Sequence, residues 1–383
     1  MTKILLLYNK IIPSVRLCVL ETFLHMHKSG QIEFNYIQYF SINKKALIES
    51  DIIIIVRADG YIERTYAKIL KLAGKYLIYV LDDDLLDVPE EISSSKHYRS
   101  NITKKNIVEI MKYCDCLLCT SPILIKKYGH FFKKSVLIDE PASIISYDHS
   151  KTNLNKKTKI GFAGSPDRII DVEKVLTNVV EKLLLKYKEK IDISFFGVKP
   201  KFIDNLNLKY IPYIENYNEY KSTLASLCWD IGLAPMLDTS FHRAKYFNKY
   251  IEYGAYGIVG VYSNLPPYNF IIRNNENGIL CNNDPNEWVS AVSFLIDNPE
   301  EQQKLKANIR KEIITRFSIN QISKKMIQNL PEILHYNSPQ KYIRGIKFLR
   351  VRGLFLSIQN YFDIYGISSI GRLFRKFLTI IKH

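Results

Sequence analysis

The sequence lacks the features that assign a chain to several common classes of protein. No run of about 18 apolar residues occurs among its 383 residues, so no transmembrane helix is expected. The apolar run in the N-terminal segment MTKILLLYNK is too short for a signal peptide, and no small-residue cleavage site follows it. We therefore interpret this segment as a first β-strand.

Cysteine is scarce, and its spacing fits no metal site. Three of the six cysteines lie in CDCLLC, residues 114–119, a spacing that matches no standard zinc pattern and has no second Cys/His pair after it. The longer segment CDCLLCTSPIL has the pattern of a buried strand that leads into a helix. We expect no metal here and a reduced, cytoplasmic compartment.

Two phosphate-binding fingerprints are also missing. The chain contains neither GxGxxG nor the lysine-bearing Walker loop, which disfavours a nicotinamide-dependent oxidoreductase. Its 26 tyrosines are spread along the chain without an RNA-binding motif, so nucleic acid is not an expected partner. The oxidoreductase, and a non-enzymatic basic protein that binds membranes or nucleic acid, stay open as alternatives.

What the sequence does contain is a repeated alternation of strands and helices. Hydrophobic residues make up 47% and charged residues 24%, as in globular proteins, and the length predicts two domains. The runs KILLLY, DIIIIV, YLIYVL and CLLCT precede a polar break, SYDHSKTNLNKKTK, after which KIGFAG, IDISFFG, LKYIPY, WDIGLAP and GIVGVYS follow. This pattern predicts an α/β protein with two Rossmann-like domains, residues 1–155 and 156–335, that face each other across a ligand cleft.

The net charge of +16 is concentrated in a third segment, residues 336–383. From Lys341 to His383 nine Lys and Arg residues stand against one acid, Asp363, so the last 43 residues carry half of the surplus. Apolar residues recur there at helical intervals, as in IRGIKFLRVRGLFLSI. We expect a basic amphipathic helical tail on an anionic membrane surface, the alternative being a helix docked on the body.

Two segments of the second domain have the chemistry of a diphosphate site. In KIGFAGSPDRIID, Gly164 and Ser165 form a turn directly after a strand, where backbone N–H groups suit phosphate oxygens. In FHRAKYFNKYIEYGAYGIVGVYS, residues 241–263, three cations precede a carboxylate. They are Arg243, Lys245, Lys249 and Glu252.

The last three of these are spaced by four and three residues, so we expect Lys245, Lys249 and Glu252 to project from one helical face toward one ligand. The cations would hold a diphosphate, and the carboxylate would accept hydrogen bonds from ribose hydroxyls. The alternative is a solvated ladder of charges.

A cluster of carboxylates marks the first domain. In YLIYVLDDDLLDVP, residues 76–89, the acids Asp82, Asp83, Asp84 and Asp87 follow a strand. Three interpretations remain: a polar acceptor site in which Asp83 orients or deprotonates a hydroxyl group, an acidic turn, or a metal site. Arg57, at another strand end, is a candidate partner of these carboxylates. His97, His130 and His242 are possible bases, of which His242 is the best placed.

Four segments together resemble a known family. GFAGSPD, DIGLAP, AKYFNKYIEYGAYGIVGVYSNLPPY and NENGILCNNDPNEWVSAVSFLIDNP, within residues 157–335, resemble the nucleotide-sugar domain of family 4 glycosyltransferases of the GT-B fold. The resemblance implies a nucleoside-diphosphate sugar bound mainly by the second domain, an acceptor bound mainly by the first, and no metal.

The resemblance also implies roles for single residues. Glu252 matches the second glutamate of the family's paired motif and would contact the ribose, whereas Ala244 occupies the place of the first. Arg168 and Lys174 lie near the place of the family's Arg/Lys pair, and Lys245 and Lys249 are the candidates for stabilising the leaving diphosphate.

These observations lead to one functional expectation. We expect a cytoplasmic enzyme, peripheral on the inner face of the cell membrane, that transfers a sugar from a nucleotide donor. The acceptor would be a glycan or a lipid-linked glycan in surface polysaccharide synthesis, and the transfer would be of the retaining type.

Overall fold

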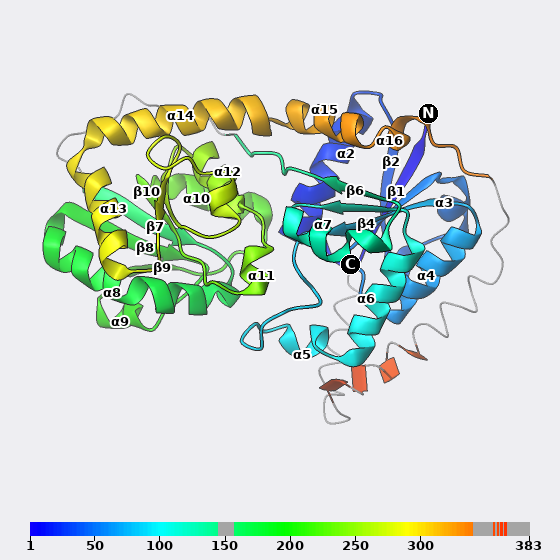
Figure 1. The fold of residues 1–383 in the computed structure, drawn as a ribbon, viewed down its shortest axis with the longest axis horizontal. Helices are drawn as coiled ribbons and strands as arrows, with labels where there is room; N and C mark the ends of the chain where they lie inside the picture. The colour runs from blue at the N-terminus through cyan, green and yellow to red at the C-terminus, as the bar shows by residue number, and fades with distance from the viewer. Residues whose placement is uncertain (145–156, 340–354, 357, 360, 363, 366–383) are drawn as a thin grey trace. The chain divides into compact units, whose positions relative to one another are not determined.

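The computed structural model describes residues 1–144 and 157–339 and eight positions between 355 and 365. The chain divides into two compact units (Figure 1). Unit 1 comprises Met1–Ile138 and Lys325–His383, and unit 2 comprises Asp139–Lys324. The polar break that we predicted as a linker lies largely outside the described residues.

Unit 1 contains a six-stranded parallel sheet in the order β2-β1-β3-β4-β5-β6. The strands are β1 (Lys3–Tyr8), β2 (Glu33–Gln38), β3 (Ile52–Val56), β4 (Tyr76–Leu81), β5 (Cys116–Cys119) and β6 (Lys134–Leu137). Every residue of β3, β4 apart from Tyr76, and β5 is buried, because helices cover a parallel sheet on both faces. The predicted strands of this half of the sequence are confirmed.

The helices of unit 1 begin where the sequence offers capping residues. They are α1 (Pro13–Val15), α2 (Glu21–Lys28), α3 (Lys44–Glu49), α4 (Tyr61–Leu72), α5 (Ser95–Tyr98), α6 (Asn101–Tyr113) and α7 (Pro122–Tyr128). Asn43 and Ser100 cap α3 and α6 by accepting a backbone N–H, and Pro122 opens α7. The segment CDCLLCTSPIL is therefore a buried strand followed by a helix, as predicted.

Unit 2 contains a second six-stranded parallel sheet, in the order β12-β11-β10-β7-β8-β9. The strands are β7 (Thr158–Ala163), β8 (Ile191–Phe196), β9 (Lys209–Ile211), β10 (Ile231–Ala234), β11 (Val259–Ser263) and β12 (Ile279–Cys281). Counted from β7, this is the strand order 6-5-4-1-2-3 of a Rossmann fold, whose direction of winding reverses between β7 and β10.

The helices of unit 2 pack on both faces of its sheet (Figure 1). They are α8 (Ile169–Tyr187), α9 (Phe202–Asn205), α10 (Tyr217–Leu227), α11 (Ser240–Arg243), α12 (Asn248–Ala255), α13 (Pro285–Asp297) and α14 (Pro299–Phe317). Each of α10, α11 and α13 starts with a side-chain cap, from Asn216, Thr239 and Asp284. The predicted α/β class with two Rossmann-like domains is confirmed.

The chain returns to unit 1 earlier than the sequence indicated. We expected the second domain to extend to residue 335, but after α15 (Ile319–Asn329) and with α16 (Glu332–His335) the chain packs into the core of the first unit. Met326, Leu330 and Ile333 are buried there among the residues of β1, β3 and β4. Lys134 of β6 forms an ion pair with Glu332 at 2.8 Å. The apolar stripe of these two helices, not the position of the polar break, decides to which unit they belong.

A buried lysine fixes the end of this returning segment. The ammonium group of Lys75 donates to the carbonyl oxygens of Ile48 at 2.7 Å and Ser50 at 2.5 Å, and to Ser338 Oγ at 3.0 Å. Burial lowers the pKa of Lys75, and the nearby Asp51 opposes this. Most of the predicted basic tail, residues 340–354 and 366–383, lies outside the described residues.

Candidate functional site

The reversal point of the second sheet places the predicted phosphate turn at the carboxyl ends of β7 and β10. Gly164 and Ser165 follow β7 and lead through a 3₁₀ turn, Pro166–Arg168, into α8. Ser165 is exposed, and its carbonyl accepts the N–H of Arg168 at 2.9 Å. Ligands of open α/β sheets bind in the crevice at this point, so the turn lies where an anion is expected.

A second glycine brings two turns into contact at this edge. Gly197, which follows β8, has a φ of +82°, and a Cβ atom built there would lie 2.1 Å from the carbonyl oxygen of Gly164. Gly164 in turn donates its N–H to the carbonyl of Phe196 at 3.0 Å. Only glycine fits at position 197, because any side chain would push the turn after β7 away from the turn after β8.

Arg168, which we expected near the place of the family's Arg/Lys pair, bridges the two sides of the reversal point. Arg168 donates to the carbonyl of Pro235, after β10, at 2.7 Å and pairs with Asp171 at 2.6 Å. Asp171 also accepts the backbone N–H of Leu237 at 3.1 Å and pairs with His242 at 3.2 Å. This network joins the segments that follow β7 and β10.

The network holds its carboxylate in the charged form. Burial raises the pKa of Asp171, but Arg168, His242 and the backbone N–H of Leu237 lower it to about 2. His242 Nδ1 lies 2.6 Å from Thr239 Oγ1, so both of its ring nitrogens are engaged. His242, which we ranked first among the possible bases, is therefore a buried member of this network.

Lys249 and Glu252, which we expected on one helical face, form an ion pair on α12. The ammonium group of Lys249 lies 2.5 Å from Glu252 Oε2, and Tyr220 of α10 donates its hydroxyl hydrogen to Glu252 Oε1 at 2.7 Å. The side chains of Lys249 and Glu252 are 16% and 19% exposed, so this is not a solvated ladder. Tyr220 stacks on Phe196, the last residue of β8, with ring centroids 5.0 Å apart.

We expected Lys245 to share a helical face with Lys249 and Glu252, but neither Lys245 nor Arg243 joins this pair. Helix α12 begins at Asn248, so Lys245 lies before it and cannot share a helical face with Lys249 and Glu252. The ammonium group of Lys245 is 4.4 Å from the centre of the Phe241 ring. Arg243 is at the surface, where its Nε and Nη2 atoms donate to the two carboxylate oxygens of Asp238. The interruption of the helix after α11 separates the cations that the spacing had aligned.

Two tyrosines connect the arginine network with the Lys249–Glu252 pair. The charges of Arg168, Asp171 and Glu252 all act on Tyr268, whose pKa is raised by burial to about 12. Tyr253 lies in the same field, close to Glu252 and Arg168, and donates its hydroxyl hydrogen to the carbonyl of Leu233 at 2.7 Å. The network of Arg168 and the Lys249–Glu252 pair thus act on the same tyrosines at the carboxyl edge of the sheet.

The carboxylates that follow β4 in unit 1 are neutralised by basic side chains. Arg57 binds both oxygens of Asp82 at 2.8 Å and reaches Asp83 at 3.4 Å. Burial alone lowers the pKa of Arg57, but the two carboxylates raise it well above its ordinary value. Asp83, whose side chain is 23% exposed, is therefore engaged in a partly buried ion pair with Arg57.

The next acid is held in the same way. Asp84 is fully buried, accepts the hydroxyl hydrogen of Tyr128 and pairs with Lys127 at 2.5 Å. Among the described residues no group of three or more His, Cys, Asp or Glu side chains could hold a metal ion. Burial raises the pKa of the Cys116 and Cys119 thiols to about 12, so these cysteines are not reactive.

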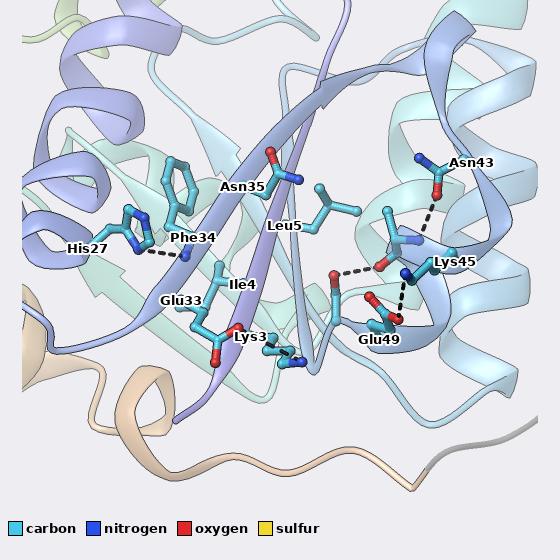
Figure 2. A pocket seen from close by; sticks show the side chains of 12 residues that line it. Lys3, Ile4, Leu5, His27, Glu33, Phe34, Asn35, Asn43, Lys45 and Glu49 are labelled. Carbon is cyan, nitrogen blue, oxygen red and sulfur yellow. Dashed lines mark hydrogen bonds and ion pairs between the residues drawn. The ribbon is translucent and has the colours of Figure 1, made fainter.

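A cavity of unit 1 contains none of these groups. It has a volume of about 410 Å³, lies at the amino ends of β1 and β2, and is lined by residues that include Lys3, His27, Glu33, Lys45 and Glu49 (Figure 2). Its charges are paired with one another, Lys3 with Glu33 and Lys45 with Glu49, each at 3.8 Å. Parallel sheets bind ligands at the opposite edge, so we assign no site to this cavity.

No protein-family model matches the sequence, and a search of curated proteins gives no match. Solved structures do match. HepE of Anabaena, in complex with UDP and glucose, is 12% identical, with a TM-score of 0.61 over 86% of this chain and 100% of that chain. Sucrose-phosphate synthase of Thermosynechococcus elongatus is 13% identical, with a TM-score of 0.62 over 87% and 99%. A glycosyltransferase of Rickettsia africae is 15% identical, with a TM-score of 0.59 over 88% and 99%.

These likenesses define the class of fold. The chain has the GT-B fold. The solved structures named above, which share this fold, are glycosyltransferases. The resemblance predicted from the four sequence segments is confirmed at the level of the fold. No helix in the described part of the chain is long and apolar enough to cross a membrane.

Proposed function

We propose that this protein is a glycosyltransferase that moves a sugar from a nucleoside-diphosphate sugar to a hydroxyl group of a glycan or lipid-linked acceptor. The observation that carries the proposal is the carboxyl edge of the second sheet. There the Gly164–Ser165 turn and Arg168 lie at the reversal point, and Tyr220, which stacks on Phe196 beside the turn, donates a hydrogen bond to Glu252 of the Lys249–Glu252 pair. Structures of HepE, which has the same fold, contain UDP or UDP-glucose.

Each group has a role that follows from its chemistry. The backbone N–H of Ser165 and the cations Arg168 and Lys249 stabilise the diphosphate, on which negative charge develops as it leaves. Glu252 accepts hydrogen bonds from ribose hydroxyls, and Tyr220 and Lys249 orient it. Since the cations supply this stabilisation, the reaction requires no metal ion in this proposal.

A panel of nucleotides tests the donor. We expect UDP or GDP to raise the melting temperature of the full-length protein, because a ligand present at about 100 times its Kd stabilises the folded state by about 2.7 kcal/mol. Stabilisation by NAD alone would support the oxidoreductase instead. If no nucleotide shifts the transition, the proposed donor site is wrong.

Substitutions at the pair test the site. We expect Lys249→Ala and Glu252→Ala each to lower donor-dependent turnover by about 10²–10³ while the protein stays folded, since each removes a preorganised charge. Turnover is measured as nucleotide release with purified protein and membrane extract. Lys311→Ala, which removes an exposed lysine of α14, is the matched control and should leave the rate unchanged.

Retaining stereochemistry and a role in surface polysaccharide synthesis are finer parts of the proposal. They are supported by the resemblance to family 4 described above. The anomeric configuration of the first product, followed by NMR from an α-linked donor, checks the stereochemistry. An inverted product would contradict it.

Peripheral attachment to the cytoplasmic face of the membrane is also part of the proposal, and the basic segment from Lys341 onward supports it. Flotation with anionic liposomes compares the full chain with two truncations, one at Lys341 and one after Tyr365. The second truncation keeps the described positions 355–365, of which Tyr365 lies against Lys96 of unit 1 at 5.4 Å. Equal binding by all three proteins would remove this part of the proposal.

A further inference from the structure

A second cavity of unit 1 lies beside the carboxyl edge of the first sheet. It has a volume of about 640 Å³, and its lining includes Lys96, Arg99, Ile102 and Ile364. Helix α5, which carries Lys96, is held at that edge by its next residue, since His97 Nε2 lies 3.0 Å from Oδ2 of Asp59 in the loop after β3. The cavity therefore lies between α5, the start of α6 and the C-terminal segment, all within one unit.

The polar part of the lining carries more positive than negative charge. Lys96 is exposed, and no carboxylate of a described residue pairs with it; its ammonium group lies 5.4 Å from the centre of the Tyr365 ring. Arg99 pairs with Glu90 at 2.5 Å, but the two side chains are 49% and 74% exposed. Such a surface pair is weak in water, so an anionic ligand competes with Glu90 for the guanidinium group.

The apolar part of the lining comes partly from the C-terminal segment. Ile102 belongs to α6, and Ile364 precedes the tyrosine that lies against Lys96. Burial, Tyr361 and Asp59 raise the pKa of Tyr365, in agreement with a place near the loop after β3. The rings of Tyr361 and Tyr365 pack with their centroids 4.8 Å apart. Cations next to apolar side chains suit a ligand that has a charged head and an apolar body.

The sequence on both sides of Ile364 indicates what carries the anion. Residues 355–365, FLSIQNYFDIY, contain four aromatic residues and a single charged one, Asp363. They lie between five Lys and Arg residues at 341–352 and four at 372–382. Phe355 is 71% exposed. Aromatic side chains between basic segments are typical of a chain that meets an anionic membrane surface, whereas a soluble phosphate needs no apolar contact.

We propose that this cavity binds the phosphate group of an anionic lipid. Lys96 and Arg99 donate to the phosphate oxygens, and Ile102 and Ile364 contact the first atoms of the apolar chain. The inference deepens the proposed membrane attachment and rests on it. A lipid held there lies beside the carboxyl edge of the first sheet, where open α/β sheets bind their ligands. The body of unit 1, and not the basic tail alone, then determines how the enzyme meets the membrane.

Hydrogen exchange of the full-length protein tests the place of binding. Peptides that cover residues 90–102 should exchange more slowly, by about twofold or more, with vesicles that contain phosphatidylglycerol than with vesicles of phosphatidylcholine alone. Peptides that cover α3, at the amino edge of the same sheet, should show no change. Slower exchange that is confined to residues beyond 340 would overturn the proposal.

Inorganic phosphate, added without vesicles, distinguishes a lipid from a soluble source of the same group. It should leave the exchange of residues 90–102 unchanged, because it makes no contact with the apolar side chains of the cavity. If it slows this exchange as much as the anionic vesicles do, the assignment to a lipid is wrong.

A double substitution, Lys96→Gln with Arg99→Gln, tests the two cations. A basic side chain near an anionic surface strengthens binding by about fivefold, so the loss of both should weaken vesicle binding by about 25-fold at low salt. The control is Lys28→Gln with Lys45→Gln, which removes the same charge from two exposed lysines at the amino edge and should leave binding nearly unchanged. Melting curves establish that both proteins are folded. Equal binding by the two double variants would overturn the proposal.

The outcomes also separate this inference from the proposed function. If the protein floats with anionic vesicles while residues 90–102 exchange as fast as in solution, the inference is wrong and the proposed attachment stands. If the protein does not float at all, the attachment and the inference both fail. The donor site of unit 2 is tested independently, by the nucleotide panel.

Discussion

The two reversal points of this molecule carry opposite chemistry on the same architecture. At the first, between β1 and β3, acidic side chains outnumber basic ones, and the cation Arg57 is paired with Asp82 and Asp83. At the second, between β7 and β10, Arg168 and Lys249 each pair with one acid, and the Gly–Ser turn adds the backbone N–H of Ser165. Both units are parallel six-stranded sheets, so the fold alone does not set this difference.

The difference teaches what each edge is suited to bind. A diphosphate carries charge that needs cations and N–H donors, which the second edge offers. The arginine of the first edge is bound by Asp82 and Asp83, and the carboxylates there suit a neutral, hydroxyl-bearing ligand better than an anion. The assignment of the donor to the second unit therefore follows from the side chains at two equivalent positions.

The largest expected effect on stability comes from removing the cation of the first edge. Arg57→Ala removes the arginine that neutralises Asp82 and Asp83 in a mostly buried place, which should cost about 3–5 kcal/mol in the free energy of unfolding. Urea unfolding measures it. Arg99→Ala removes an arginine of a surface pair with Glu90 and should cost less than about 1 kcal/mol. Equal costs would show that the Arg57 network is not a structural requirement of this edge.

The turn contact of the second edge gives an intermediate effect. Gly197→Ala combines a left-handed φ, which costs about 1–2 kcal/mol, with overpacking against Gly164, which costs about 1–3 kcal/mol. Gly30→Ala, at a φ of +71° with nothing within 4 Å, should show the first cost alone. Nucleotide binding should weaken only in the Gly197 variant. Equal stability of the two variants would contradict the contact between the turns.

The smallest effect is the acid dependence of the second edge. The pKa of Asp171 is depressed to about 2 in the folded protein, against about 3.9 in an unfolded chain. Its contribution to stability is therefore present above pH 4 and lost as the pH falls from about 4 to 2, and amounts to about 2 kcal/mol. Asp171→Asn should flatten the stability curve over this range, whereas Asp192→Asn, at an exposed site on β8, should not. A curve for Asp171→Asn that keeps the wild-type slope would exclude the charged network.

Local sequence patterns predicted the strands, the Gly164–Ser165 turn and the shared helical face of Lys249 and Glu252, because these depend on residues that are close in the chain. They failed for Lys245, since spacing assumes one continuous helix and α12 begins only at Asn248. The Arg168–Asp171–His242 network was missed because His242 is 71 residues from Asp171 in the chain. The only sign of this network in the sequence was the spacing of Arg168 and Asp171, one helical turn apart after the glycine turn. This spacing becomes informative only once the strand order is known.

The contacts of Lys75 have a consequence for the order in which the protein is made. The lysine meets Ser338, and the core of unit 1 contains Met326 and Ile333, so this unit is built from both ends of the chain. Unit 2 is a continuous segment and can be completed on the ribosome as soon as residue 324 has emerged. The part that is synthesised first is therefore finished last. Until then its core lacks Met326, Leu330 and Ile333, and Lys75 lacks one of its three acceptors.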